Sequence, residues 1–200
     1  GQCGSCWSFS ATGAMEGAWA IETGELLSFS EQQLVDCSSG FRSYGNHGCN
    51  GGLMDGAFNY AIQNGMCSES EYPYHAKQGE CQSCDPVVSM TACNDVPPND
   101  QVALTEAVAK GPVSVAIEAD TRTFQLYTGG VITSDACGTN LDHGVLVVGY
   151  GDETNIPYWL VKNSWGPSWG EQGYVKIQRS SSSNDPGVCG IAMQPSFPIV

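Results

Sequence analysis

Apolar residues in the first third of the chain recur at the spacing of a helix that buries one face. After Ser5, a residue type that often caps helices, a helical run begins at Cys6 and stops at Gly24. Its apolar positions are Trp7, Ala11, Ala14, Met15 and Ala18. The pattern predicts a helix that carries Cys6 in its first turn.

Two further helices are predicted in the same part of the chain. Ser30 with Gln33 three residues later has the form of a capping box and opens a short helix. A polar loop over 38–47 follows, and then a glycine-rich turn over 48–52. The helix after this turn is closed by Gly65. Its apolar positions are Leu53, Ala57, Phe58, Tyr60 and Ala61.

The apolar pattern changes period in the second half of the chain. Residues 72–98 are rich in turn formers, and a short helix is expected over 104–110. The strands predicted beyond it are 113–119, 144–150, 158–162 and 174–178. Helices first and strands later favour an α+β protein with a helical lobe over 1–95 and a β-barrel-like lobe over 96–200. Active sites commonly lie between such lobes.

Composition narrows the class of protein and of partner. The chain has 200 residues and 41% hydrophobic content without a long apolar run, so we expect a globular protein with no membrane-spanning helix. Its net charge of −14 argues against nucleic acids and anionic membranes as partners. An acidic compartment would suit this balance, because protonation of carboxylates relieves their mutual repulsion.

The ten cysteines indicate an oxidising compartment, so we expect a lysosomal, vacuolar or secreted protein. No secretory signal is visible at the start, as expected for a processed chain or a fragment. Composition alone does not assign the disulfide pairs.

Cys6 is the candidate nucleophile. Unpaired backbone N–H groups and the helix dipole favour negative charge at a helix start, so its thiol should ionise more readily than an ordinary one. Cys3 and Cys6 also form a Cys-x-x-Cys pair. Taken alone, that pair is compatible with a redox motif, half a zinc site or two structural cysteines.

A thiolate nucleophile needs a basic or cationic partner, and the chain has three histidines. His47 and His75 lie in polar loops, whereas His143 stands at the head of an apolar strand. Asn163 lies at a strand end and would orient the imidazole through a neutral amide, with Trp165 shielding the bond from water. Without a partner motif, His143 would be interpreted as a core histidine, and Asn163 and Trp165 as a turn and a core aromatic residue.

These motifs together resemble those of a known family. Cys3-Gly4-Ser5-Cys6-Trp7 matches the signature around the nucleophile of papain-like cysteine peptidases, which have His and Asn far downstream. His143 and Asn163 follow in the expected order, and the similarity extends over nearly the whole chain. It implies a two-lobe fold, helical and then β-barrel-like, with the active site in the cleft between the lobes.

The resemblance implies an endopeptidase that works by two-step acyl transfer. Cys6 would attack a peptide carbonyl, and His143 would protonate the leaving amine and then activate water to release the thioester. The backbone N–H of Cys6 would donate to the oxyanion. In the family the second donor is a glutamine side chain six residues before the nucleophile, which here would precede Gly1, so we expect the sequence to be truncated.

The resemblance also suggests the substrate contacts. Gly51 and Gly52 would pair with an extended substrate backbone, and an apolar pocket would accept a bulky hydrophobic residue at the second position before the cut. Gln194 would lie at the floor of this pocket. The segment 52–61 is similar to that of the cathepsin L and plant endopeptidase group. The expected substrate-binding residues are Gly4, Gly51, Gly52, Leu53, Met54, Ala116, Leu141, Asp142, Gly144, Trp165 and Gln194.

By the same resemblance three disulfides are expected. The implied pairs are Cys3 with Cys49, Cys37 with Cys81, and Cys137 with Cys189, and they leave Cys6 as a thiol. Cys67, Cys84 and Cys93 have no counterpart in the family pattern, and because three is an odd number we expect at least one more thiol outside the disulfides.

Two rival functions come from other classes. A non-catalytic family member would serve in binding, and a thiol–disulfide oxidoreductase would use Cys3 with Cys6 if Cys3 were able to exchange. A zinc site that adds Cys81 and Cys84 to this pair is the weakest alternative, because the two pairs are far apart in the sequence.

We expect a monomer without cofactor or metal. Its expected partners are peptide and protein substrates, a propeptide in the precursor and inhibitors of the cystatin kind.

Overall fold

The computed structural model describes residues 1–40, 44–134 and 136–200, which form two compact units. The first unit contains Gly1–Asn94 together with Phe197–Val200, and the second contains Asp95–Ser196. Part of the predicted polar loop over 38–47 falls on 41–43, outside the described residues. No helix in the described ranges combines the length and the apolar character that a membrane span requires.

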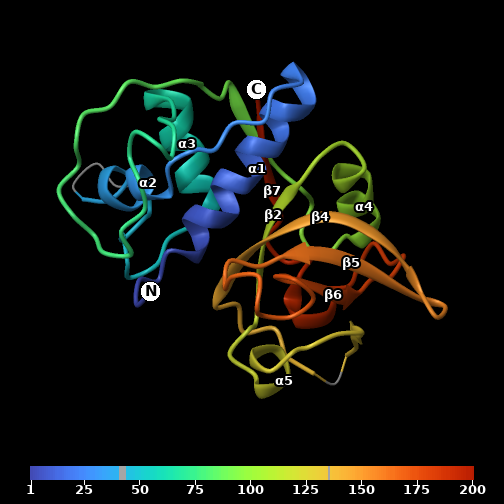
Figure 1. The fold of residues 1–200 in the computed structure, drawn as a ribbon. Helices are drawn as coiled ribbons and strands as arrows, with labels where there is room; N and C mark the ends of the chain where they lie inside the picture. The colour runs from blue at the N-terminus through green and yellow to red at the C-terminus, as the bar shows by residue number, and fades with distance from the viewer. Residues whose placement is uncertain (41–43, 135) are drawn as a thin grey trace. The chain divides into compact units, whose positions relative to one another are not determined.

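Three helices form the core of the first unit (Figure 1). They are α1 (Cys6–Thr23), α2 (Glu31–Cys37) and α3 (Met54–Asn64). Helix α1 packs against both α2 and α3, and the small buried residues Ala11, Ala14, Ala57 and Ala61 allow close approach. The predicted stop at Gly24 is confirmed, since this residue has a left-handed φ of 78°.

The helix starts differ in detail from the sequence predictions. The Ser30 hydroxyl accepts from Gln33 N at 2.9 Å, which is the first bond of the predicted capping box. The second bond is replaced by contacts with Cys67, since Ser30 N donates to Cys67 O and Gln33 Oε1 accepts from Cys67 N. Ser5 was expected to cap α1 in the same way, but its side chain makes no capping bond. Its hydroxyl instead lies 2.5 Å from the Tyr74 hydroxyl, because a distant loop offers a partner that the local sequence does not reveal.

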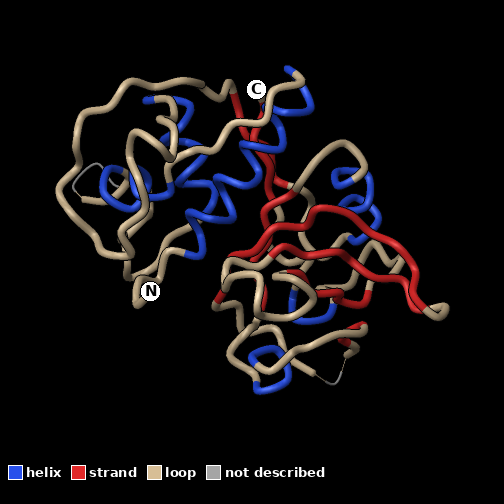
Figure 2. The backbone as a smooth tube through the Cα atoms, viewed as in Figure 1, coloured by secondary structure: helices blue, strands red, loops and turns tan. Residues whose placement is uncertain are grey.

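The second unit contains most of the strands (Figure 2). Its strands are β2 (Val113–Ile117), β3 (Val131–Ile132), β4 (His143–Glu153), β5 (Ile156–Lys162) and β6 (Tyr174–Gln178). Its helices are α4 (Gln101–Val108), α5 (Arg122–Gln125) and the short 3-10 helix η1 (Val188–Gly190). Helix α4 begins earlier than predicted because Asp100 caps it, accepting from Ala103 N at 2.9 Å.

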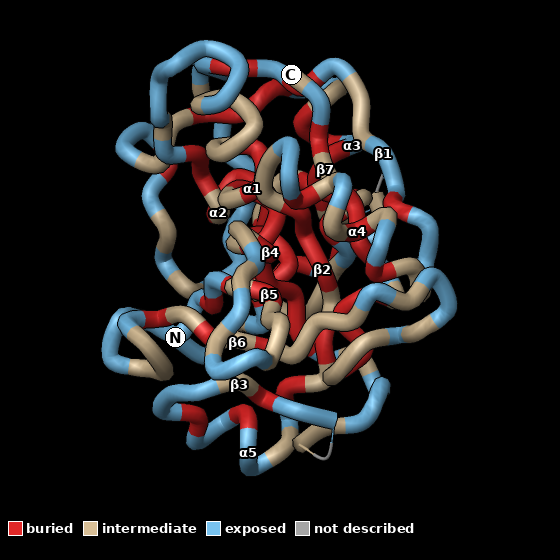
Figure 3. Tube along the Cα trace, turned by 90° about the vertical axis from the view of Figure 1, so that its right-hand side faces the viewer, coloured by how far each residue is buried: buried red, intermediate tan, exposed pale blue. Residues whose placement is uncertain are grey.

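The sheet is open rather than a closed barrel, which corrects the barrel-like lobe expected from the sequence. Its strand order is β1-β7-β2-β4-β5-β6-β3, with β1 (Ala92–Asp95) and β3 at the two ends. Strand β7 (Ser196–Ile199) joins β2 through the pairing of Ser196 with Ser114. Buried residues follow β2, β4 and β5, which form the middle of the sheet (Figure 3). The mixed helix and sheet content agrees with the predicted α+β class.

Four disulfides stabilise the two units. Three are the pairs that the family resemblance implied: Cys3–Cys49, Cys37–Cys81 and Cys137–Cys189. The fourth, Cys67–Cys84, joins two of the three cysteines that the sequence left unassigned. Cys6 and Cys93 are the two cysteines outside the disulfides. Each bond restricts the unfolded chain and so favours the folded one.

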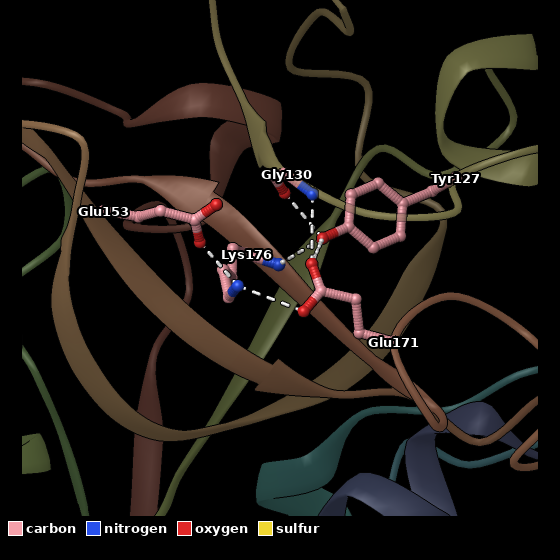
Figure 4. A network of polar contacts seen from close by, with 5 residues as sticks. All are labelled: Tyr127, Gly130, Glu153, Glu171 and Lys176. Atoms are coloured by element: carbon pink, nitrogen blue, oxygen red, sulfur yellow. Dashed lines mark hydrogen bonds and ion pairs between the residues drawn. The ribbon is translucent and has the colours of Figure 1, made fainter.

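A charged network anchors the loops of the second unit to its sheet (Figure 4). Lys176 on β6 contacts Glu153 at 2.5 Å and Glu171 at 3.0 Å. Glu171 Oε1 also accepts from Gly130 N at 3.0 Å and lies 2.9 Å from the Tyr127 hydroxyl. The bonds from both carboxylates raise the pKa of Lys176, so the ion pairs persist at neutral pH.

A partly buried glutamate makes the stability of the first unit depend on pH. Burial raises the pKa of Glu31 from 4.5 to about 8, a bond from Thr12 opposes the rise, and nearby Glu69 and Glu16 add to it. Between these two pH values the folded chain holds a proton that the unfolded chain has lost. The free energy of unfolding should therefore decrease as pH rises through this window.

We predict that Glu31→Gln removes most of this dependence. The amide can still accept the Thr12 hydroxyl, which lies 2.7 Å from Glu31 Oε1, and it carries no charge. Thermal unfolding should be followed from pH 4.5 to 8 with the Cys6 thiol alkylated, so that thiol chemistry does not change with pH. At pH 8 the variant should melt higher than the parent, by about 2–4 °C for each kcal/mol gained.

The exposed Glu25 provides the matched control, because Glu25→Gln removes the same charge from an exposed position. Equal changes in the two variants would refute the role of Glu31.

Candidate active site

The start of α1 holds Cys6 between two fixed neighbours. Gly4 N donates to Cys49 O at 2.8 Å, next to the Cys3–Cys49 disulfide. A Cβ at Gly4 would lie 2.6 Å from Cys49 O, so only glycine allows this close approach. On the other side Trp7 is buried and donates from Nε1 to Gly48 O at 3.2 Å. The backbone on both sides of Cys6 is therefore anchored to the glycine-rich turn.

The position of Cys6 favours a thiolate. It is the first residue of an 18-residue helix and is partly exposed. Backbone N–H groups of the first turn and the helix dipole stabilise negative charge there. These are the conditions that activate a cysteine nucleophile.

The redox and zinc alternatives both need cysteine thiols that are held in disulfides in this structure. Cys3 is bonded to Cys49, so it is not the exchanging partner of Cys6 that an oxidoreductase would require. Cys81 and Cys84 are also held in disulfides, with Cys37 and Cys67. Within residues 1–40, 44–134 and 136–200 no group of three or more metal-binding side chains is found.

The glycine-rich turn lies beside Cys6 in the first unit. A bridge between Gly4 and Asn50 sets the two segments side by side. Gly52 packs so closely that a Cβ there would lie 2.7 Å from the Trp7 ring. Asn46 Oδ1 accepts from Leu53 N at 2.8 Å and so fixes the end of the turn. Of the predicted substrate-binding residues here, Leu53 is 54% exposed, whereas Met54 is buried.

The second unit brings His143 and Asn163 together. His143 is the first residue of β4, and Asn163 directly follows β5, which pairs with β4 in antiparallel register. His143 Nε2 lies 2.7 Å from Asn163 Oδ1, and both side chains are buried. The sheet pairing thus places two residues from separate motifs in direct contact.

The contacts of Asn163 determine the protonation of the ring nitrogen that it faces. Asn163 Oδ1 also accepts from Ser164 N at 2.8 Å, which identifies the oxygen end of the amide. A carbonyl oxygen only accepts, so Nε2 of His143 carries the proton of this bond. Nδ1 is therefore the ring nitrogen whose proton can be exchanged with a reacting group.

Aromatic rings surround the His143–Asn163 bond. Trp165 lies 4.9 Å from the His143 ring, and Phe124 lies 6.3 Å from it. Trp169 packs 5.1 Å from Phe124 and 5.2 Å from Trp165. Trp165 remains 37% exposed, so it covers the histidine from the solvent side. Such a cover lowers the local dielectric and strengthens the polar bond beneath it.

The segment before His143 is held by its own carboxylate. Asp142 accepts from Ala119 N at 2.8 Å and Asp120 N at 3.2 Å, and its backbone N donates to Ile117 O. These bonds define the direction in which the chain enters β4. Asp142 therefore has a visible role in placing the residue that follows it.

The remaining predicted residues of the second unit are only partly gathered by the structure. Ala116 and Gly144 are register partners in β2 and β4. Leu141 is partly buried two residues before His143. Gln194 is exposed, and within the described residues no hydrogen bond or ion pair joins it to this group.

Sequence reasoning missed two supports of this half of the site. Phe124 on α5 contacts both His143 and Trp165, but a single phenylalanine in a polar segment carries no such signal. Gly173 accepts through its backbone carbonyl from Asn163 N at 3.0 Å, a contact that depends on tertiary structure alone. The described geometry thus consists of a Cys6 half in the first unit and a His143–Asn163 half in the second.

Comparison with known proteins assigns this geometry to a family. The model of the papain family of cysteine proteases matches residues 1–199. Germination-specific cysteine protease 1 of Arabidopsis thaliana is 52% identical over 203 residues, which cover 100% of this chain and 53% of the relative. Cysteine endopeptidase RepA of Oryza sativa subsp. japonica is 52% identical over 204 residues, with the same coverage. The chain thus spans about half the length of these curated relatives.

Two solved structures have the same fold. The proform of the ragweed pollen allergen Amb a 11, a cysteine protease, matches with a TM-score of 0.93 and 47% identity over 100% of this chain and 61% of its own. Bromelain from Ananas comosus in complex with the E-64 inhibitor matches with a TM-score of 0.91 and 40% identity, over 99% of this chain and 90% of its own. The papain-like fold expected from the sequence is confirmed, and this chain belongs to the papain family of cysteine proteases.

Proposed function

We propose that the protein is a cysteine endopeptidase in which Cys6 is the nucleophile, His143 the general acid and base, and Asn163 the residue that orients the histidine. The observation that carries this proposal is the 2.7 Å bond from His143 Nε2 to Asn163 Oδ1, buried beside Trp165. It dedicates one ring nitrogen to orientation and the other to chemistry. Family membership supplies the second support.

The proposed reaction divides peptide hydrolysis into two acyl transfers. The Cys6 thiolate attacks the carbonyl carbon, and the tetrahedral oxyanion accepts from the backbone N–H of Cys6. His143 gives a proton from Nδ1 to the departing amine, which leaves a thioester on Cys6. The same nitrogen then takes a proton from water, whose oxygen attacks the thioester and releases the acid.

Asn163 supports this cycle without adding charge. The working pair is a thiolate and an imidazolium, so the net charge of the site is already balanced. A carboxylate in place of Asn163 would add a negative charge beside the imidazolium and oppose its loss of the proton. The amide oxygen keeps the ring in place in both protonation states.

We further propose that the enzyme prefers a bulky hydrophobic residue at the second position before the cut. Ala116, Leu141 and Gly144 offer small or apolar surfaces at the entry to β4. Gln194 would add a neutral polar group, which does not select a basic side chain as a carboxylate would. Gly51 and Gly52 would pair with the backbone of the extended substrate.

A precursor with a propeptide and an oxidising, acidic compartment belong to the same proposal. Four disulfides suit a lysosomal, vacuolar or secreted enzyme. The similar Amb a 11 protease has been solved as a proform. We propose that this enzyme acts as a monomer and that inhibitors of the cystatin kind bind it.

We predict that Cys6→Ser lowers the rate of peptide hydrolysis at least about 1000-fold, because the hydroxyl does not ionise at neutral pH. Cys93→Ser is the matched control, since Cys93 is the other cysteine outside the disulfides. Hydrolysis of a fluorogenic peptide and the mass of the adduct formed by an epoxide inhibitor would be measured together. An inactive parent that forms no adduct at Cys6 would refute the proposed function.

Asn163→Ala should lower kcat/KM by about 10- to 100-fold, because a hydrogen bond to a charged partner contributes about 1.5–3 kcal/mol. The effect should lie mainly in kcat, since the substrate does not contact the amide. Asn184→Ala, in an exposed loop, is the control. Unchanged kinetics in the folded Asn163 variant would remove this residue from the mechanism.

Gln194→Glu should shift selectivity towards a basic residue at the second position before the cut. The ratio of kcat/KM for arginine over phenylalanine at this position should rise by about tenfold or more, because a carboxylate attracts the guanidinium. Gln82→Glu places the same charge at an exposed site of the first unit and serves as control. An equal change in both variants would attribute the shift to net charge alone.

A further inference from the structure

The loop over 163–174 carries both the orienting residue and the aromatic cover of His143. Asn163 stands at its start and Trp165 follows two residues later, and Trp169 at the centre of the loop packs 5.2 Å from Trp165. Gly173 N donates to Trp169 O at 2.7 Å, and Gly173 O accepts from Asn163 N at 3.0 Å. A shift of the 169–174 turn would therefore move the backbone of Asn163 and the ring of Trp169 together.

Glu171 fastens this turn to two other elements. Its Oε2 contacts Lys176 on β6 at 3.0 Å, and its Oε1 accepts from Gly130 N at 3.0 Å (Figure 4). The Tyr127 hydroxyl lies 2.9 Å from the same Oε1, and the Tyr127 ring packs 5.7 Å from Trp169. One carboxylate thus links the turn, the strand and the loop after α5.

Glu171 is held in its charged form. Burial alone would raise the pKa of this carboxyl, but bonds from Lys176, Tyr127 and Gly130 N outweigh it and hold the pKa below its ordinary value. Burial raises the pKa of Tyr127 to about 12, so its hydroxyl keeps the proton. At neutral pH Glu171 is therefore charged and the Tyr127 hydroxyl is protonated.

We propose that Glu171 is a positioning residue, which fixes the 169–174 turn and so holds Asn163, Trp165 and Trp169 in register around His143. The inference rests on the proposed function, because the quantity that it affects is the reactivity of the Cys6 and His143 pair. Glu171 itself contacts neither the substrate nor the reacting atoms. It acts through the turn, the Gly173 carbonyl and the stacked tryptophans.

The test is the pH profile of alkylation of Cys6 by the anionic reagent iodoacetate, compared with kcat/KM for a peptide. Alkylation reports on the thiolate and imidazolium without requiring peptide binding or an oxyanion site. The variant Glu171→Gln keeps the size of the side chain but loses the charge that holds Lys176. We expect kcat/KM to fall by about 3- to 10-fold, mostly in kcat, as for the loss of one hydrogen-bonded link.

The expected signature is a change that mere loss of stability would not produce. The alkaline limb of the alkylation profile should move to lower pH in Glu171→Gln, by roughly half a unit, because a less firmly oriented histidine holds its proton less well. Near-ultraviolet circular dichroism should also change as the Trp165 and Trp169 rings lose their fixed geometry.

Glu153→Gln is the matched control. Glu153 contacts the same lysine at 2.5 Å but stands at the end of β4, and within the described part of the chain no hydrogen bond or ion pair joins it to the turn. It should change the melting temperature without moving the alkylation profile. All variants would be made in the full-length precursor, which would be activated before the measurements.

The outcomes separate the inference from the function on which it rests. A parent that neither cleaves peptides nor alkylates faster than a simple thiol at acidic pH would refute the proposed function. An active parent whose profile is the same in Glu171→Gln would refute the role of Glu171. Equal displacement of the profile by both variants would also refute the role of Glu171. The cause would then be the loss of a negative charge beside Lys176 and not a change in the 169–174 turn.

Discussion

The antiparallel pairing of β4 with β5 is the constraint on which the histidine half of the site depends. His143 begins β4 and Asn163 directly follows β5. The register that pairs Leu146 with Lys162 brings the two side chains into contact. Val147 and Val161 are register partners and both are fully buried, so the packing of the core favours this register. A slip by one residue would turn these side chains to the opposite face and separate the pair. The register that packs the core of this sheet therefore also sets the geometry of the His143–Asn163 pair.

The cysteine half depends on a different constraint, which is close approach of backbone to backbone. Gly4 meets Cys49 O where no side chain would fit, and Gly52 meets the Trp7 ring in the same way. The Cys3–Cys49 disulfide adds a covalent bond at this point. Because Cys6 is the first residue of α1, these contacts fix both the direction of the helix and the place of the sulfur. At Gly4 and Gly52 the absence of a side chain leaves the space that Cys49 O and the Trp7 ring occupy.

Local patterns in the sequence predict some of these features, and tertiary contacts decide the others. The helix from Cys6 to Gly24 and the strand over 174–178 follow from periodicity and stop signals. The cap at Ser5 failed because the Tyr74 hydroxyl, distant in sequence, binds the same oxygen. The open sheet differs from the expected barrel because closure depends on how edge strands pair, which alternation along one strand does not encode. The contact of Phe124 with His143 has no local signal either.

The charged network beneath the tryptophans complements what the aromatic contacts alone provide. Ring packing excludes water from the His143–Asn163 bond, but it tolerates sliding and rotation, since dispersion attraction has little directionality. The bonds of the Glu171 carboxylate to Gly130 N and Lys176 are directional and fix one geometry of the turn. Their cost is also moderate, because both charged side chains remain partly in contact with solvent. The charged side chains thus lie at the edge of this cluster and the apolar rings at its centre, an arrangement that suits the role proposed for His143 in both of its protonation states.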